Sequence, residues 1–142
     1  MPLVLGQYPD VFNAAVLRNP VTNLGEISTS DIPDWYFEEI GVSYKPGQIM
    51  TPDIYKDAFE KSPMAYIDRV RAPVQLHLGL KDQRVSLDQS KKYYHALKAR
   101  SKPVEMLCFK DDSHGIESVE GARVAYYATK KLFDSIQSLP KD

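Results

Sequence analysis

Three short apolar runs stand out in the hydrophobic pattern of the chain, at residues 14–18, 74–78 and 104–109. Proline or polar turn residues bound each run, which is typical of short buried strands. Apolar positions recur at helical spacing in residues 87–98 and 119–138. Because strands alternate with helices, the pattern predicts an α/β fold in which about three parallel strands are joined by right-handed crossovers.

Further helices are predicted before and inside the long insert between the first two strands. Residues 34–40 form a short amphipathic stretch, with Asp34 as the expected N-cap. Thr51 followed by Pro52 is typical of a helix start, because proline is favoured at the first helical position. Residues 3–9 resemble the end of another helix. A helix at the very start of a chain suggests that the natural element begins upstream.

The two long helices have distinct predicted core faces. Ser86 is the expected N-cap of residues 87–98, and Tyr94 and Leu97 are expected on the buried side. The predicted stripe of the last helix contains Ala122, Ala125, Thr129, Leu132, Phe133, Ile136 and Leu139.

Composition narrows the functional classes. The 142 residues contain 43% hydrophobic and 26% charged residues, as in an ordinary globular domain, and the net charge of −1 favours neither nucleic acid nor a membrane surface as a partner. A single cysteine excludes an internal disulfide, and the scattered histidines lack metal-ligand spacing. We therefore expect no metal or other cofactor. The first residues lack a signal-peptide pattern, so a cytoplasmic location is expected.

The candidate chemistry follows the second and third strands. Asp82 lies in a turn just after residues 74–78, and His114 lies in a turn just after residues 104–109. Parallel strands bring their carboxyl ends to one edge of the sheet, where ligands bind. A carboxylate beside an imidazole can orient the ring and stabilise the imidazolium, so the pair is typical of a hydrolase triad in the order Ser…Asp…His.

The first member of that triad is missing from the sequence. A nucleophile elbow has the pattern Gly-x-Ser-x-Gly at a strand-to-helix turn, and no serine of the chain lies in such a pattern. Ser113, next to His114, lies in neither an elbow nor a strand-to-helix crossing. We therefore predict that the serine nucleophile is absent from this chain.

For other candidate site residues the sequence allows both a functional and a structural interpretation. Arg18 and Asn19 end the first strand and could either bind a substrate carbonyl or carboxylate or cap the turn. Trp35 and its two aromatic neighbours could line a substrate pocket, although a core position is favoured. His77 is expected to be a core histidine, and Cys108 is expected to be buried in its strand.

Several motifs together resemble the acylaminoacyl-peptidases of the prolyl oligopeptidase family of serine peptidases. They are residues 5–9 (Leu-Gly-Gln-Tyr-Pro), 18–21 (Arg-Asn-Pro-Val), 31–35 (Asp-Ile-Pro-Asp-Trp), 61–63 (Lys-Ser-Pro), 79–85 (Gly-Leu-Lys-Asp-Gln-Arg-Val) and 113–114 (Ser-His). The resemblance implies that residues 1–142 are the C-terminal portion of an α/β-hydrolase fold, incomplete because the nucleophile elbow and an N-terminal β-propeller are lacking. It also implies that Asp82 and His114 are the catalytic aspartate and histidine.

The implied activity of the parent enzyme is the release of an N-acylamino acid from an N-acylated peptide. The chain alone, without the serine, is expected to be inactive. One alternative is a non-catalytic truncated product that acts by association, because an unpaired strand at the edge of a partial sheet can pair with another chain and form a homo-oligomer. Another alternative is a different member of the same family, such as a dipeptidyl-peptidase.

Overall fold

A computed structural model describes residues 2–26 and 30–137, and its centre is a parallel three-stranded sheet. The strands are β1 (Ala15–Arg18), β2 (Val74–Gly79) and β3 (Val104–Phe109), in the spatial order β1-β2-β3. Val74 pairs with Ala15 on one side and with Val104 on the other, so all three strands run in register toward the same edge. The predicted α/β class with three parallel strands is confirmed.

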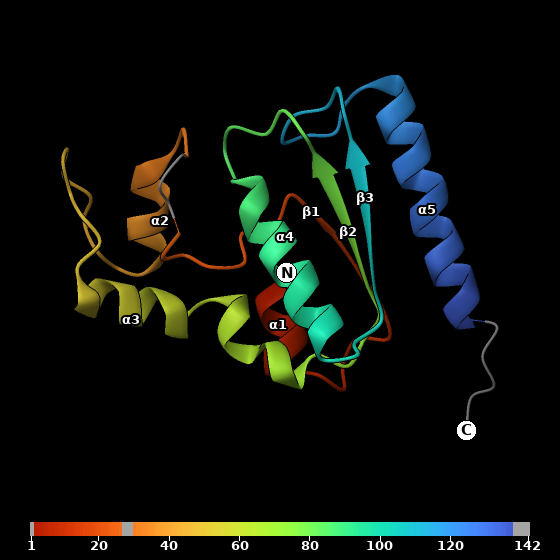
Figure 1. The fold of residues 1–142 in the computed structure, drawn as a ribbon, viewed down its shortest axis with the longest axis horizontal. Coiled ribbons are helices and arrows are strands. Elements are labelled where there is room, and N and C mark those ends of the chain that lie inside the picture. Colours follow the sequence, from red (N-terminus) through yellow and green to blue (C-terminus); the bar gives the residue numbers. More distant parts are fainter. Residues whose placement is uncertain (1, 27–29, 138–142) are drawn as a thin grey trace.

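Helices cover both faces of this sheet (Figure 1). One face carries α4 (Leu87–Ala99), α1 (Pro2–Gln7) and the 3₁₀ helix η1 (Pro63–Arg69), and the other carries α5 (Val119–Gln137). The insert between β1 and β2 also contains α2 (Pro33–Glu39) and α3 (Pro52–Glu60).

The main core lies between the sheet and α4. Leu76 and Leu78 of β2 pack there against Tyr93 and Leu97 of α4, and Leu5 of α1 completes the cluster. These side chains are almost fully buried, and burial of one such residue contributes about 2 kcal/mol to stability. The centre of the sheet is therefore held firmly, and the loops at its carboxyl edge start from fixed points.

Two helix starts confirm the capping predictions, and one does not. The Thr51 hydroxyl accepts a hydrogen bond from the Ile54 amide at 3.4 Å, and Ser86 accepts one from the Asp88 amide at 3.3 Å. Asp34, in contrast, is not an N-cap: α2 begins one residue earlier at Pro33, with Ile32 in the capping position and no side-chain hydrogen bond. The proline fixes the start, because its ring presets the helical φ.

The long helices differ from their predicted faces in detail. Leu97 is buried as predicted, and Tyr94 is partly buried and packs against the same core. The fully buried tyrosine is its neighbour Tyr93, one helical turn before Leu97. In α5 the buried side of the helix contains Gly121 and Ala125. The predicted stripe is wrong at Ala122 and Phe133, which are exposed. Three further members of the stripe are partly buried: Thr129, Leu132 and Ile136. Leu139 lies outside the described residues.

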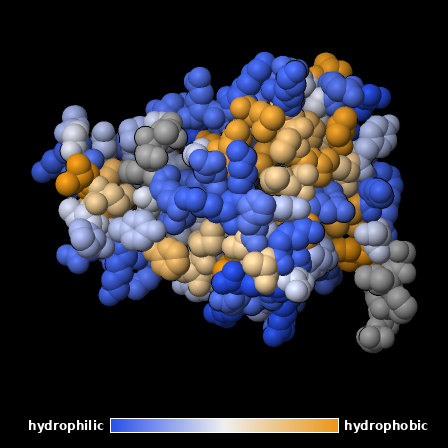
Figure 2. Space-filling model, in the orientation of Figure 1, coloured by the Kyte–Doolittle hydropathy of each residue, from blue (hydrophilic) through white to orange (hydrophobic). Residues whose placement is uncertain are grey.

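The expectation that every strand is buried fails for β3. This strand forms one edge of the sheet, and Cys108 within it is exposed rather than buried. Figure 2 shows hydrophobic side chains gathered along this side of the molecule, over β2 and β3 between α4 and α5. Edge position alone does not expose a side chain, because Ala15 and Leu17 of the other edge strand, β1, are buried. Cys108 is exposed because packed side chains do not cover it.

A buried polar network attaches the insert to the core of the molecule. The Gln89 side chain of α4 accepts hydrogen bonds from the amides of Thr22 and Asn23, at 2.8 and 3.0 Å, and donates one to the Glu26 carbonyl at 3.0 Å. Thr22 donates its hydroxyl proton to the Gln89 carbonyl at 3.0 Å. One glutamine therefore fixes the path of the chain as it leaves β1 and enters the insert.

Candidate active site

Asp82 lies in the turn after β2, and its carboxylate is fixed by the backbone of that same turn. Its Oδ1 accepts hydrogen bonds from the amides of Arg84 and Val85, at 2.8 and 3.1 Å. The side chain is 0% exposed. Its other oxygen, Oδ2, lies 2.9 Å from Nδ1 of His114. A carboxylate held in this way keeps one oxygen aimed at the imidazole.

His114 lies in the loop after β3, and its side chain is 41% exposed. The turns after β2 and β3 lie next to each other at the top of Figure 1, which brings together two residues 32 positions apart. With the Nδ1 proton directed at Asp82, Nε2 carries the free lone pair. The pair can therefore accept a proton at Nε2 while the carboxylate stabilises the resulting cation.

A pocket of about 360 Å³ borders His114. It is lined by Asp31, Lys81, Gln83, Arg84, Ser113, His114, Gly115 and Glu117. Charged side chains of both signs and the exposed imidazole of His114 line this pocket, so its surface suits a polar substrate group.

The loop that carries His114 is seated on the end of β2. The amide of Lys81 donates to the Asp112 carbonyl at 2.9 Å. Gly79 leaves room for this approach, because a Cβ at that position would lie 2.0 Å from the carbonyl oxygen of Ser113. The carboxylate of Asp112 accepts hydrogen bonds from the amide and hydroxyl of Ser118, at 2.7 and 2.8 Å, and these bonds, the amide first, lower the pKa of Asp112. The loop is thereby tied to the start of α5.

The three predicted substrate-binding residues lie in different surroundings. Asn19 is buried, and its side chain is hydrogen-bonded within the protein, so it does not face the pocket beside His114. Arg18 is exposed and borders another cavity, beside β1. Trp35 is partly exposed on α2, with its ring edge-on to Tyr36 at 5.1 Å, and is not among the residues that line the pocket of His114. For all three residues substrate binding stays a prediction.

The sequence patterns did not predict an ion pair between Arg84 and Asp31 beside His114. Arg84 pairs with Asp31 at the border of the pocket, with its Nε and Nη2 each 3.3 Å from one carboxylate oxygen. These hydrogen bonds raise the pKa of Arg84 above its ordinary value. Both residues lie within motifs of the family resemblance, but only the fold shows that residues 53 positions apart form a forked ion pair.

The aromatic residues beside Trp35 are core residues, as favoured. Tyr36 and Phe37 are almost fully buried. The hydroxyl of Tyr36 donates to the carbonyl of Arg84 at 3.4 Å, so α2 rests against the turn of Asp82. Burial is the main cause that raises the pKa of Tyr36.

His77 is a core histidine, as predicted. It is fully buried in β2, with Nε2 2.8 Å from the Gln75 side-chain oxygen and its ring 5.7 Å from that of Phe109. Gln75 in turn donates to Glu105 at 3.2 Å. Burial, with a smaller contribution from the charge of Arg18, lowers the pKa of His77 to about 4.

This pKa makes the stability of the chain dependent on pH. Between pH 6.5 and about 4 the unfolded chain binds a proton at His77 and the folded chain does not. The free energy of unfolding should therefore decrease as the pH falls through that window, by roughly 3 kcal/mol in total.

Urea denaturation at several pH values measures this decrease in the free energy of unfolding. His77→Leu should remove the dependence, whereas His95→Gln, at an exposed position of α4, should retain it; equal slopes in all three proteins would contradict the assignment.

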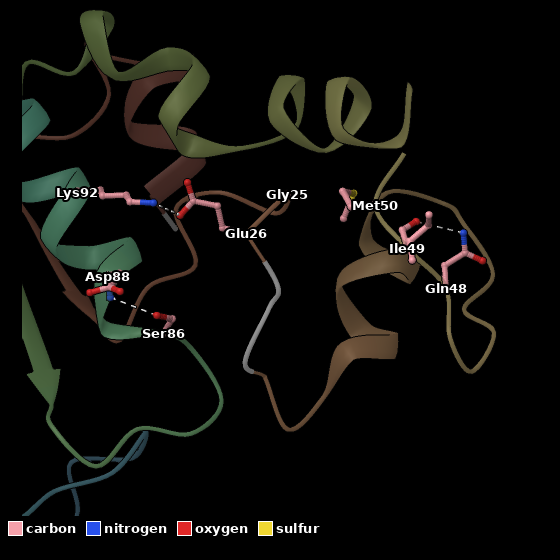
Figure 3. Close-up of a pocket in the computed structure, with 8 residues that line it drawn as sticks. All are labelled: Gly25, Glu26, Gln48, Ile49, Met50, Ser86, Asp88 and Lys92. Atoms are coloured by element: carbon pink, nitrogen blue, oxygen red, sulfur yellow. Dashed lines mark hydrogen bonds and ion pairs between the residues drawn. The ribbon is translucent and has the colours of Figure 1, made fainter. Parts of the chain in front are cut away.

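A second pocket, of about 490 Å³, lies away from the Asp82–His114 pair (Figure 3). Gln48, Ile49 and Met50 form one wall, and the start of α4 forms the other, where Lys92 pairs with Glu26 at 3.1 Å. None of the predicted site residues lines it.

Residues 2–26 and 30–137 contain neither a metal-binding cluster nor a membrane-spanning helix. No group of three or more His, Cys, Asp or Glu side chains in this part of the chain is arranged to hold a metal ion. None of its helices is both long enough and apolar enough to cross a membrane.

Comparison with known proteins decides the family of the chain. The sequence profile described as "Prolyl oligopeptidase family" matches residues 1–135. The chain belongs to this family. Mouse acylamino-acid-releasing enzyme is 41% identical over 118 residues, which are 82% of this chain but only 16% of the mouse protein. The chain thus spans about a sixth of the length of this prolyl oligopeptidase relative.

Two further comparisons place the chain among these peptidases. One solved structure is an acylaminoacyl peptidase in complex with Z-Gly-Gly-Phe-chloromethyl ketone, which superposes on this chain with a TM-score of 0.75 and 28% sequence identity. The matched region is 92% of this chain and 21% of the solved chain. Dipeptidyl aminopeptidase BIII of Pseudoxanthomonas mexicana is 28% identical over 79% of this chain and 16% of its own length. The predicted resemblance and the α/β-hydrolase fold are both confirmed.

Proposed function

We propose that this chain supplies the aspartate and histidine of a serine peptidase that acts on N-acylated peptides. The observation that carries the proposal is the hydrogen bond between His114 Nδ1 and Asp82 Oδ2, 2.9 Å long, with a fully buried carboxylate beside an open pocket. Family membership and the similarity to acylamino-acid-releasing enzymes support it.

In the proposed reaction, His114 is the general base and Asp82 holds and stabilises it. Nε2 of His114 takes the proton of a serine hydroxyl as the serine oxygen attacks the peptide carbonyl. The imidazolium then gives that proton to the leaving amine, which leaves an acyl-enzyme. Water, deprotonated by His114, releases the N-acylamino acid and restores the serine. No cofactor enters this chemistry.

The serine and the oxyanion-hole donors are proposed to come from outside these 142 residues. The chain contains no Gly-x-Ser-x-Gly pattern, so the chain by itself is proposed to be inactive. Residues 1–142 then represent part of a peptidase domain without its nucleophile elbow and β-propeller. The cytoplasmic location and self-association remain predictions.

A chimera tests the proposal. Mouse acylamino-acid-releasing enzyme is rebuilt with this chain in place of the segment that it matches. The chimera is expected to release N-acetylamino acids from acetylated peptides, and the isolated chain is expected to resist labelling by a fluorophosphonate serine probe.

The controls separate the proposed function from its alternatives. A folded chimera that hydrolyses free-amine dipeptidyl substrates in preference to acetylated ones would favour the dipeptidyl-peptidase alternative. A folded chimera with neither activity would show that Asp82 and His114 do not support hydrolysis and would favour a non-catalytic product. Circular dichroism of both proteins establishes folding.

A further inference from the structure

Asn19 joins the ends of all three strands. It directly follows β1, and its amide donates to the His77 carbonyl of β2 at 2.9 Å. Its side-chain Oδ1 accepts a hydrogen bond from the Gly79 amide, at the end of β2, at 2.9 Å. Its Nδ2 donates to the carbonyls of Ser113 and His114, after β3, at 3.2 and 2.8 Å. An ordinary turn residue bonds to near neighbours, whereas these side-chain bonds span 60, 94 and 95 positions.

The backbone conformation, burial and hydrogen bonds at position 19 all favour asparagine over other residues. Asn19 has φ of +40°, in the left-handed region that asparagine enters at lower cost than most residues with a Cβ. It is 3% exposed, so its polar atoms need partners within the protein. One short side chain must accept from an amide and donate to two carbonyls, which a carboxamide does and a carboxylate cannot.

These bonds hold His114 at a second point. Asp82 fixes the ring at Nδ1, and Asn19 fixes the main chain of the same residue at its carbonyl oxygen. Two residues further on, Ile116 is buried with φ of +50°, an unfavourable conformation for a β-branched residue. A loop that contains such a residue needs restraint from its surroundings, and Asn19 provides part of it.

We infer that Asn19 is a positioning residue for the general base: it holds the backbone of His114 so that the ring meets Asp82. The catalytic consequence rests on the proposed function, but the geometric one does not. Asn19→Asp is the sharpest variant, because it preserves size and the acceptor, removes both donors and places a carboxylate against two carbonyl oxygens.

Imidazole ¹⁵N spectra of the 142-residue chain test the geometry without catalysis. In the unaltered chain His114 should be present as the Nδ1–H tautomer bonded to Asp82. Asn19→Asp should shift His114 toward a mixture of tautomers. Asn19→Gly, which retains the left-handed backbone but lacks the side chain, should do the same. Asn13→Asp makes the same chemical change at an exposed position and should leave the spectrum unaltered.

Kinetics of the chimera test the consequence. Asn19→Asp should lower kcat by about 100-fold with KM little changed, since a base displaced by about an ångström binds substrate but transfers protons poorly. If both Asn19 variants retain the His114 tautomer and kcat while the melting temperature falls, Asn19 is only a structural turn residue. If the spectra change but the unaltered chimera is inactive, the positioning role holds and the proposed function fails.

Discussion

Replacement of Asp82 by asparagine in the chimera is expected to lower kcat for acetylated peptides by about four orders of magnitude. The variant retains the shape of the turn, because the asparagine Oδ1 can still accept hydrogen bonds from the amides of Arg84 and Val85. Its Nδ2 then lies where Oδ2 now meets Nδ1 of His114. Two donors cannot face each other, so the imidazole should adopt the tautomer with its proton on Nε2. In that form it cannot take a proton from serine.

The pH profile and a matched control make this result specific. Because the variant loses the base rather than the fold, activity should recover partly at high pH, where hydroxide can replace the histidine, and KM should change little. Asp111→Asn changes an exposed aspartate of the neighbouring turn, paired with Lys81, and should leave kcat unaltered. A loss smaller than about tenfold in Asp82→Asn would show that Asp82 does not orient the base.

Replacement of Gln89 by alanine is expected to cause a large loss of stability, roughly 4 kcal/mol in the free energy of unfolding. The variant leaves the amides of Thr22 and Asn23 and the carbonyl of Glu26 without their partner. These groups lie in a buried or partly buried region, so water cannot fully replace the lost bonds. Removal of the side chain also leaves a cavity beside α4.

Denaturation by urea, followed by tryptophan fluorescence, measures this loss. Trp35 is the single tryptophan and lies on α2, in the insert that Gln89 fastens, so its signal reports on the affected region. Gln137→Ala removes an exposed glutamine from α5 and should change stability by less than about 0.5 kcal/mol. Equal midpoints for Gln89→Ala and the unaltered chain would mean that the network contributes nothing to stability.

Local sequence patterns predicted the elements of the fold and two residues of the candidate site, Asp82 and His114. The apolar runs of β1, β2 and β3 and the helix starts at Thr51 and Ser86 are short-range signals, and the structure contains all of them. Asp82 and His114 were found by the same logic, because each follows a strand and parallel strands end at one edge. Strand order predicts that the two residues lie at one edge of the sheet, while their contact at 2.9 Å also depends on the turns that carry them.

Burial was the first thing that local patterns could not decide. Cys108 occupies an apolar run like those of the other strands, yet it is exposed, whereas Ala15 and Leu17 of the other edge strand are buried. Tyr93 and Tyr94 are adjacent and chemically identical, and only the rotation of α4 against the sheet makes Tyr93 fully buried and Tyr94 partly buried. Such outcomes depend on what packs opposite a residue, and a sequence pattern records only the residue itself.

The sequence by itself determined the alternation of strands and helices, the family motifs, and the two residues that form the candidate base and its orienting carboxylate. Tertiary structure alone decided the partners that lie far apart in the chain. Arg84 pairs with Asp31, 53 positions away, and the side chain of Asn19 bonds to residues 60 or more positions away. The physical reason is that hydrogen bonds depend on atoms within about 3 Å of each other. That proximity is created only when the sheet aligns three strand ends and buries the groups between them.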